Sequence, residues 1–184
     1  MGRRTTMTVV AVGMLLVVTG CGSTKGGTAT PSTGAAGTSA AAAALWDPCT
    51  QISDQVLQKI GLDPASKEKD VAGVPEPGFK VCGWHDPAMP HVYNITVFST
   101  LHTVEDFKRK SDNIEFTDVS IRGRGGLTYR SASYQKDEGC DLIFPATQGA
   151  IQVSAFNPGP EGRRTPPCDR AKAAADALVP LFPR

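Results

Sequence analysis

Tyr93-Asn94-Ile95-Thr96-Val97-Phe98-Ser99-Thr100 is the segment with the clearest structural signal in the chain. Tyr93, Ile95 and Val97 alternate with the polar residues Asn94 and Thr96. This is the two-residue period of a strand with one buried and one solvated face. The segment therefore predicts a sheet that packs against a core on one side.

Further strands are predicted on both sides of this segment. Residues 81–84 precede it, and residues 117–121, 127–133, 141–145 and 150–156 follow it, with Gly-rich turns between them. We expect the last four strands to form an antiparallel meander. Arg122 to Gly126 is the predicted turn between the first two of them.

Three helices are predicted from their end signals. Ser53 caps a helix over 54–60 that stops at Gly61. Thr103 and Asp106 form a capping box for a second helix, which runs to about residue 111. Residues 168–178 form an Ala-rich helix. The charged, Pro-containing segment 63–80 is expected to be a loop. The fold class is therefore α+β, an antiparallel sheet of about five to six strands with helices packed on it.

The N-terminus has the pattern of a bacterial lipoprotein signal. Arg3-Arg4 precede the apolar residues 7–18, and Val17-Val18-Thr19-Gly20-Cys21 is a small-residue junction that ends in cysteine. About 12 apolar residues cover roughly 18 Å of helix, against a hydrocarbon core of about 30 Å, so the segment is too short to span a membrane. We expect residues 1–20 to be a signal peptide and Cys21 to be the lipidated first residue of the mature chain. The arginine pair leaves both the general secretory and the twin-arginine route open.

The mature chain is expected to have two parts. Residues 21–44 contain Gly, Ser, Thr, Ala and Pro with a single charge, Lys25, and form a disordered tether. Residues 45–184 form one domain. Removal of the signal takes away two of the 19 basic residues and none of the 18 acidic ones, which leaves a charge of about −1. A nearly neutral chain has no excess of positive charge to attract nucleic acid or anionic lipid headgroups. We therefore expect membrane contact through the lipid on Cys21.

The other four cysteines are Cys49, Cys82, Cys140 and Cys168. An even number outside the cytoplasm indicates two disulfides, and four cysteines allow three connectivities, among which the sequence alone cannot select. We favour Cys49 with Cys82 and Cys140 with Cys168, because each pair joins the end of a predicted helix to a nearby strand.

A family resemblance follows from several short motifs. Asp47-Pro48-Cys49 leads into a short helix that ends at Gly61-Leu62-Asp63-Pro64, then come Cys82-Gly83-Trp84 and a Gly-rich turn, and Cys168 opens an Ala-rich helix. With the lipobox and the tether, this order resembles an actinobacterial lipoprotein family catalogued as domain of unknown function 3558. The resemblance implies an envelope location and a disulfide-bonded domain, and it brings no catalytic residues.

Motifs for common enzyme chemistry are missing from the sequence. It contains no phosphate-binding G-x-x-x-x-G-K-[ST] loop, no G-x-S-x-G serine elbow and no H-E-x-x-H zinc motif. His85, Asp86 and His91, with His102 further along, are the only concentrated set of metal-ligand residue types. The alternative is that Asp86 places a turn and the imidazoles are solvated, and we expect neither a metal nor a cofactor.

Two further features have both a structural and a functional interpretation. Arg122 and Arg124 mark a hairpin turn, or an exposed anion-binding tip built with the adjacent backbone amides. Trp46 and Trp84 belong to the core or line a ligand groove. Core placement is favoured. Apolar residues make up 40% of the chain, a figure that includes the signal, so few apolar side chains remain to line a large cavity once the core is filled.

The sequence thus favours a non-enzymatic, membrane-anchored lipoprotein whose domain binds a protein, lipid or cell-wall partner outside the cytoplasm. The first alternative is an envelope enzyme with its site at His85, Asp86 and His91. The second is a lipid carrier with an apolar cavity.

Overall fold

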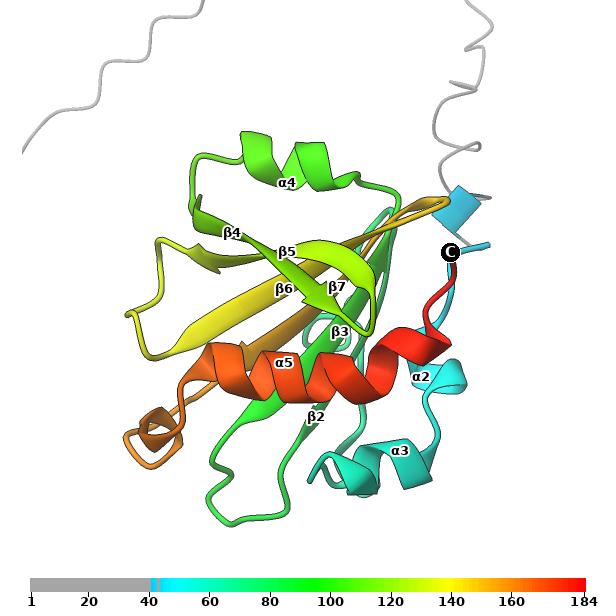
Figure 1. Cartoon of the computed structure of the whole chain (residues 1–184). Coiled ribbons are helices and arrows are strands. Elements are labelled where there is room, and N and C mark those ends of the chain that lie inside the picture. The colour runs from blue at the N-terminus through cyan, green and yellow to red at the C-terminus, as the bar shows by residue number, and fades with distance from the viewer. Residues whose placement is uncertain (1–40, 43) are drawn as a thin grey trace, which may run out of the picture. The chain divides into compact units, whose positions relative to one another are not determined.

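The computed structural model describes residues 41, 42 and 44–184 and contains one seven-stranded antiparallel sheet (Figure 1). The strand order is β1-β2-β3-β7-β6-β5-β4. The predicted α+β class is confirmed, with one strand more than the expected five to six. The strands are β1 (Glu68–Lys69), β2 (Phe79–His85), β3 (Asn94–Thr100), β4 (Asn113–Ile121), β5 (Arg124–Ser131), β6 (Gly139–Ala146) and β7 (Gly149–Phe156).

Most strands that are neighbours in the sheet are also neighbours along the chain. Strands β4 to β7 form the predicted meander, because each pairs with the next along the chain. Strand β7 then pairs with β3 along its whole length, from Asn94 opposite Phe156 to Thr100 opposite Ala150. The inward residues Ile95 and Val97 of β3 are no more than 1% exposed, as their alternation predicts.

Helices cover both faces of the sheet. On one face, α2 (Pro48–Gln51), α3 (Asp54–Lys59) and α5 (Pro167–Leu178) pack on the main core, and Figure 1 shows α5 crossing the sheet. On the other face, α4 (Val104–Arg109) places Phe107 against Tyr129, Ile143 and Ala150. Three 3-10 turns complete the described elements: Pro64–Ser66, Gly162–Arg164 and Val179–Leu181.

The helix ends follow their sequence signals with one exception. Thr103 and Asp106 form the reciprocal capping box of α4. Gly61 ends the turn after α3 with a φ of +79°, a value that favours glycine. Ser53 occupies the N-cap position of α3, but its hydroxyl makes no capping hydrogen bond.

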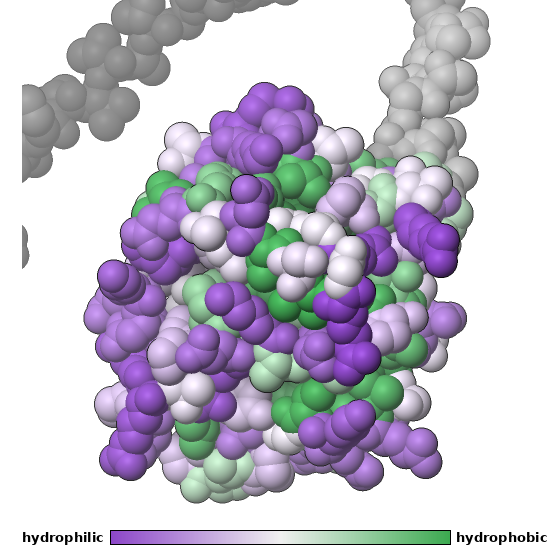
Figure 2. Space-filling model, viewed as in Figure 1, coloured by the Kyte–Doolittle hydropathy of each residue, from purple (hydrophilic) through white to green (hydrophobic). Residues whose placement is uncertain are grey.

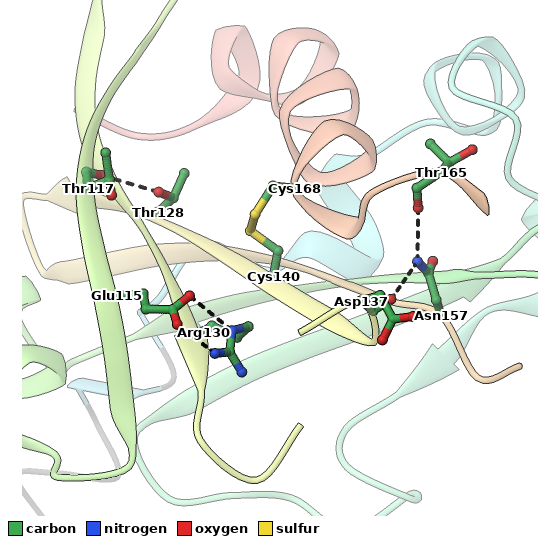
Figure 3. Close-up of a disulfide and its surroundings, with 9 residues drawn as sticks. All are labelled: Glu115, Thr117, Thr128, Arg130, Asp137, Cys140, Asn157, Thr165 and Cys168. Atoms are coloured by element: carbon green, nitrogen blue, oxygen red, sulfur yellow. Dashed lines mark hydrogen bonds and ion pairs between the residues drawn. A yellow bond between two sulfur atoms is a disulfide. The ribbon is translucent and has the colours of Figure 1, made fainter. Parts of the chain in front are cut away.

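Both disulfides connect a helix to a strand. Cys49 of α2 is bonded to Cys82 of β2, and Cys140 of β6 is bonded to Cys168 in the first turn of α5 (Figure 3). This is the pairing that the sequence favoured among the three possible connectivities. Near the second bridge, the Asn157 side-chain amide donates to the carbonyls of Asp137 and Thr165, which joins the loops on either side of it (Figure 3).

Three local expectations need correction. The segment 63–80 is not entirely loop, because Glu68 and Lys69 form the short edge strand β1. Strand β4 begins at Asn113, not at 117, and continues through a bulge where Glu115 has a φ of +59°. The hairpin turn consists only of Arg122 and Gly123, both at positive φ, and Arg124 already belongs to β5.

The predicted signal peptide at 1–20, Cys21 and the tether up to residue 40 lie outside the described residues. Among the residues that the structure does describe, no helix is long and apolar enough to cross a membrane.

Candidate functional site

The structure brings the two predicted histidines of the β2–β3 turn together. The rings of His85 and His91 are stacked, with centroids 4.8 Å apart and planes inclined by 20°. His85 Nδ1 lies 2.7 Å from the carbonyl oxygen of Asp86, which fixes the orientation of this imidazole. His102 lies elsewhere, against Phe79.

The Asp86 carboxylate serves the turn. Its Oδ1 accepts hydrogen bonds from the backbone N–H groups of Val92 at 2.6 Å and Tyr93 at 3.1 Å, and its Oδ2 accepts from Ala88 at 3.3 Å. With 7% exposure, this side chain is occupied in holding the loop. The interpretation of Asp86 as a turn residue therefore replaces its interpretation as a ligand, and the described residues contain no group of three or more metal-ligating side chains.

Arg122 and Arg124, the predicted hairpin residues, both bind distant parts of the chain. Arg122 donates to the carbonyl and the carboxylate of Asp176 in α5. Arg124 donates to the carbonyl oxygens of Pro145 at 2.6 Å, Pro183 at 2.7 Å and Phe182 at 3.4 Å. Sequence analysis missed this arrangement because both arginines bind segments more than 20 residues away; they join the β4–β5 hairpin to the C-terminal part of the domain.

The two tryptophans have different surroundings. Trp84 is 2% exposed and belongs to the main core, as favoured. Trp46 is partly buried, with its ring 5.5 Å from that of Phe182, and it lines a pocket of about 390 Å³ beside the β6–β7 turn.

A wider groove of about 690 Å³ lies along Arg122, Arg124 and Phe182. A third pocket, of about 400 Å³, lies between α3 and α5.

Asp141 is a buried acid that sequence analysis did not single out. It lies opposite Tyr129 and Ser154 in the sheet, is 5% exposed, and accepts a hydrogen bond from Gln152 Nε2 at 2.9 Å. Burial raises the pKa of the Asp141 carboxyl, and hydrogen bonds from Ser154 and Gln152 oppose this effect. The signal available in the sequence was an acid inside a predicted strand whose neighbours are all apolar.

Replacing Asp141 by asparagine should stabilise the domain at high pH. A carboxyl whose folded pKa is raised contributes stability at low pH and loses it as the pH rises through the folded value. The amide in the Asp141→Asn variant does not ionise, so the melting temperature of this variant should exceed that of the wild type at pH 8, by roughly 2–4 °C per kcal/mol gained. The difference should disappear near pH 3. Thermal unfolding of both proteins between pH 3 and pH 8 measures this difference in melting temperature. Equal melting temperatures at pH 8 would contradict the prediction.

The family of the chain follows from a comparison with family models. The model described as protein of unknown function (DUF3558) matches residues 16–181. The chain belongs to this family. The DUF3558 match includes Cys21 and all four cysteines of the two disulfides. The search of curated proteins found no match, and neither did the search of solved structures.

Proposed function

We propose that the protein is a lipoprotein of an actinobacterial envelope, anchored through lipid on Cys21 to the extracytoplasmic face of the cell membrane. The observation that carries this proposal is the pairing of cysteines: the two disulfides of the described residues use every cysteine of the chain except Cys21. Disulfides persist in oxidising compartments, and a cysteine after a short apolar signal is the position that receives diacylglycerol. Two or more acyl chains give stable anchoring.

We further propose that the domain binds a partner and does not catalyse a reaction. His85 and His91 line a small pocket of about 210 Å³. The other three polar groups at the predicted sites are occupied by the chain itself: Asp86 by backbone N–H groups, Arg122 by Asp176, and Arg124 by three carbonyls. Such groups hold the fold and are not free to activate a substrate. This favours a binding role over an enzyme centred on the His85–His91 turn.

The anchoring proposal predicts a large effect of Cys21→Ala. Without the thiol, the chain should incorporate no radioactive palmitate and should accumulate as the longer form that retains residues 1–20. Labelling and gel mobility of both forms measure this. As the matched control, the double variant Cys49→Ala, Cys82→Ala should still be labelled. Normal processing of the Cys21→Ala form, or a wild type that takes up no palmitate, would contradict the proposal.

The binding role is tested by proximity labelling in the envelope of the native host. A labelling enzyme fused to the full chain should mark a set of envelope proteins or lipids. The control carries residues 1–44 fused to the same labelling enzyme, so it shares the anchor and tether. Labelling that is identical with and without residues 45–184 would contradict a binding role for the domain.

A further inference from the structure

The pocket between α3 and α5 combines an apolar lining with cationic side chains. Its volume is about 400 Å³, within the range of small-molecule sites. Figure 2 shows an apolar patch on this face, just below α5, bordered by hydrophilic residues. The apolar contributors are Ile60, Ile95, Ala173 and Ala174, and the charged ones are Lys59, Asp169 and Arg170.

The Arg170 guanidinium is held in a fixed position. It lies over the ring of Tyr93, 4.0 Å from the centroid, an arrangement that suits the planar guanidinium. The Tyr93 hydroxyl in turn donates to the carbonyls of Ile60 at 3.2 Å and Gly61 at 3.1 Å. A Cβ on Gly61 would lie 2.9 Å from this hydroxyl oxygen, so glycine is needed there for space as well as for φ. Tyr93 is thus a positioning residue for Arg170.

The donors of Arg170 are largely unused. Among the described residues, its buried Nε has no hydrogen-bond partner, and its side chain makes one hydrogen bond, from Nη2 to the Gly162 carbonyl at 3.4 Å. Burying a hydrogen-bond donor without an acceptor is unfavourable. A ligand does not reach the buried Nε, but Nη1 is accessible and makes no hydrogen bond among the described residues, so it can donate to an acceptor that a ligand supplies.

The positive charge of the pocket is only partly balanced by its negative charge. None of the ion pairs among the described residues includes Lys59 or Arg170. Residues 1–40 and 43 contain no Asp or Glu, so every acidic side chain of the protein lies in the described part. Asp169 lines the pocket without pairing with either cation, which leaves a net charge of +1 on the lining.

We propose that this pocket binds a monoanionic amphiphile with a carboxylate head and a short alkyl chain. The carboxylate accepts hydrogen bonds from the Arg170 guanidinium and Lys59 Nζ, and the chain packs on the apolar lining. This inference rests on the proposed binding role and specifies its ligand class. The single negative charge of the ligand balances the net charge of +1 on the lining. Because the Arg170 guanidinium is already held in place by Tyr93, it loses little conformational freedom on binding.

Calorimetry with octanoate tests the proposal, using the full chain with Cys21→Ala and both disulfides formed. Octanoate should bind at least ten-fold more tightly than octanol, which lacks the charge, and octylammonium, which reverses it. Inorganic phosphate and acetate, which lack the chain, should also bind at least ten-fold more weakly. Equal affinity for octanol or for acetate would overturn the proposal.

Variants locate the binding. Arg170→Gln should weaken octanoate binding at least ten-fold, and Lys59→Gln, on the exposed last turn of α3, should weaken it three-fold or more without affecting folding. Arg164→Gln is the matched control, because exposed Arg164 pairs with Glu161 outside the pocket, and it should bind as the wild type does. Unchanged affinity in the Lys59→Gln and Arg170→Gln variants would overturn the proposal. Failure of octanoate binding together with domain-dependent proximity labelling would remove only this ligand class, whereas labelling that is identical with and without residues 45–184 would remove the binding role itself. The anchoring proposal stands in both cases, because neither result concerns lipidation.

Discussion

Replacing Cys140 and Cys168 together by alanine is expected to lower the free energy of unfolding by about 3–4 kcal/mol. The bridge closes a loop between residues 28 positions apart, and its loss lets the unfolded chain sample many more conformations. In the folded state, it fixes the first turn of α5 to β6, beneath a helix that buries Ala171, Ala175 and Leu178. The double variant leaves no unpaired thiol within residues 45–184.

Urea unfolding of the wild type and the double variant measures this cost by linear extrapolation. The Cys21→Ala variant is the control, because it removes a cysteine outside the domain and should unfold with the wild-type free energy. Loss of the Cys49–Cys82 bridge, with a separation of 33 residues, should cost a similar amount. A cost below about 1 kcal/mol for either bridge would mean that the disulfides do not stabilise the domain as described.

Replacing Phe144 by alanine is expected to cost about 3–5 kcal/mol. Phe144 lies in β6 with no exposed surface, and its ring centroid is 6.0 Å from that of Phe182. On the neighbouring strand, a Cβ at Gly126 would lie 2.7 Å from the Phe144 ring, so the ring occupies space that this glycine leaves open. Truncation removes the buried ring and leaves a cavity between β6 and the C-terminal segment.

Chemical denaturation of the Phe144→Ala variant gives the measurement. Phe156→Ala provides the comparison, because Phe156 is partly exposed at the end of β7 and packs on the exposed Tyr134. Its loss should cost clearly less, about 1–2 kcal/mol. Equal costs at the two positions would contradict the placement of Phe144 in the main core.

The regular parts of the fold were predictable because their signals are local. The alternation in 93–100 gave β3, and the Thr103–Asp106 pair gave the start of α4. The sequence alone could not select the cysteine pairing, but a predicted strand and a predicted helix end near each partner favoured the pairing that the structure has. Strand β1 could not be predicted, since Glu68 and Lys69 are both exposed and have no apolar pattern.

The site residues were harder to predict because their roles depend on distant partners. The sequence placed Asp86 in a turn, but only the fold shows that its carboxylate binds three backbone groups. Arg170 and Tyr93 are 77 positions apart, and no short motif connects them. The partners of Arg122 and Arg124 could not be predicted for the same reason, since the groups that these arginines bind come from α5, β6 and the C-terminal segment.

An intact-mass measurement of the protein, purified from the membranes of its own host, tests the anchoring proposal most directly. We predict a chain that begins at Cys21, carries the mass of diacylglycerol, and reacts with no thiol reagent until Cys49, Cys82, Cys140 and Cys168 are reduced. A chain that still carries residues 1–20, with an unmodified Cys21 and free thiols in the domain, would contradict it.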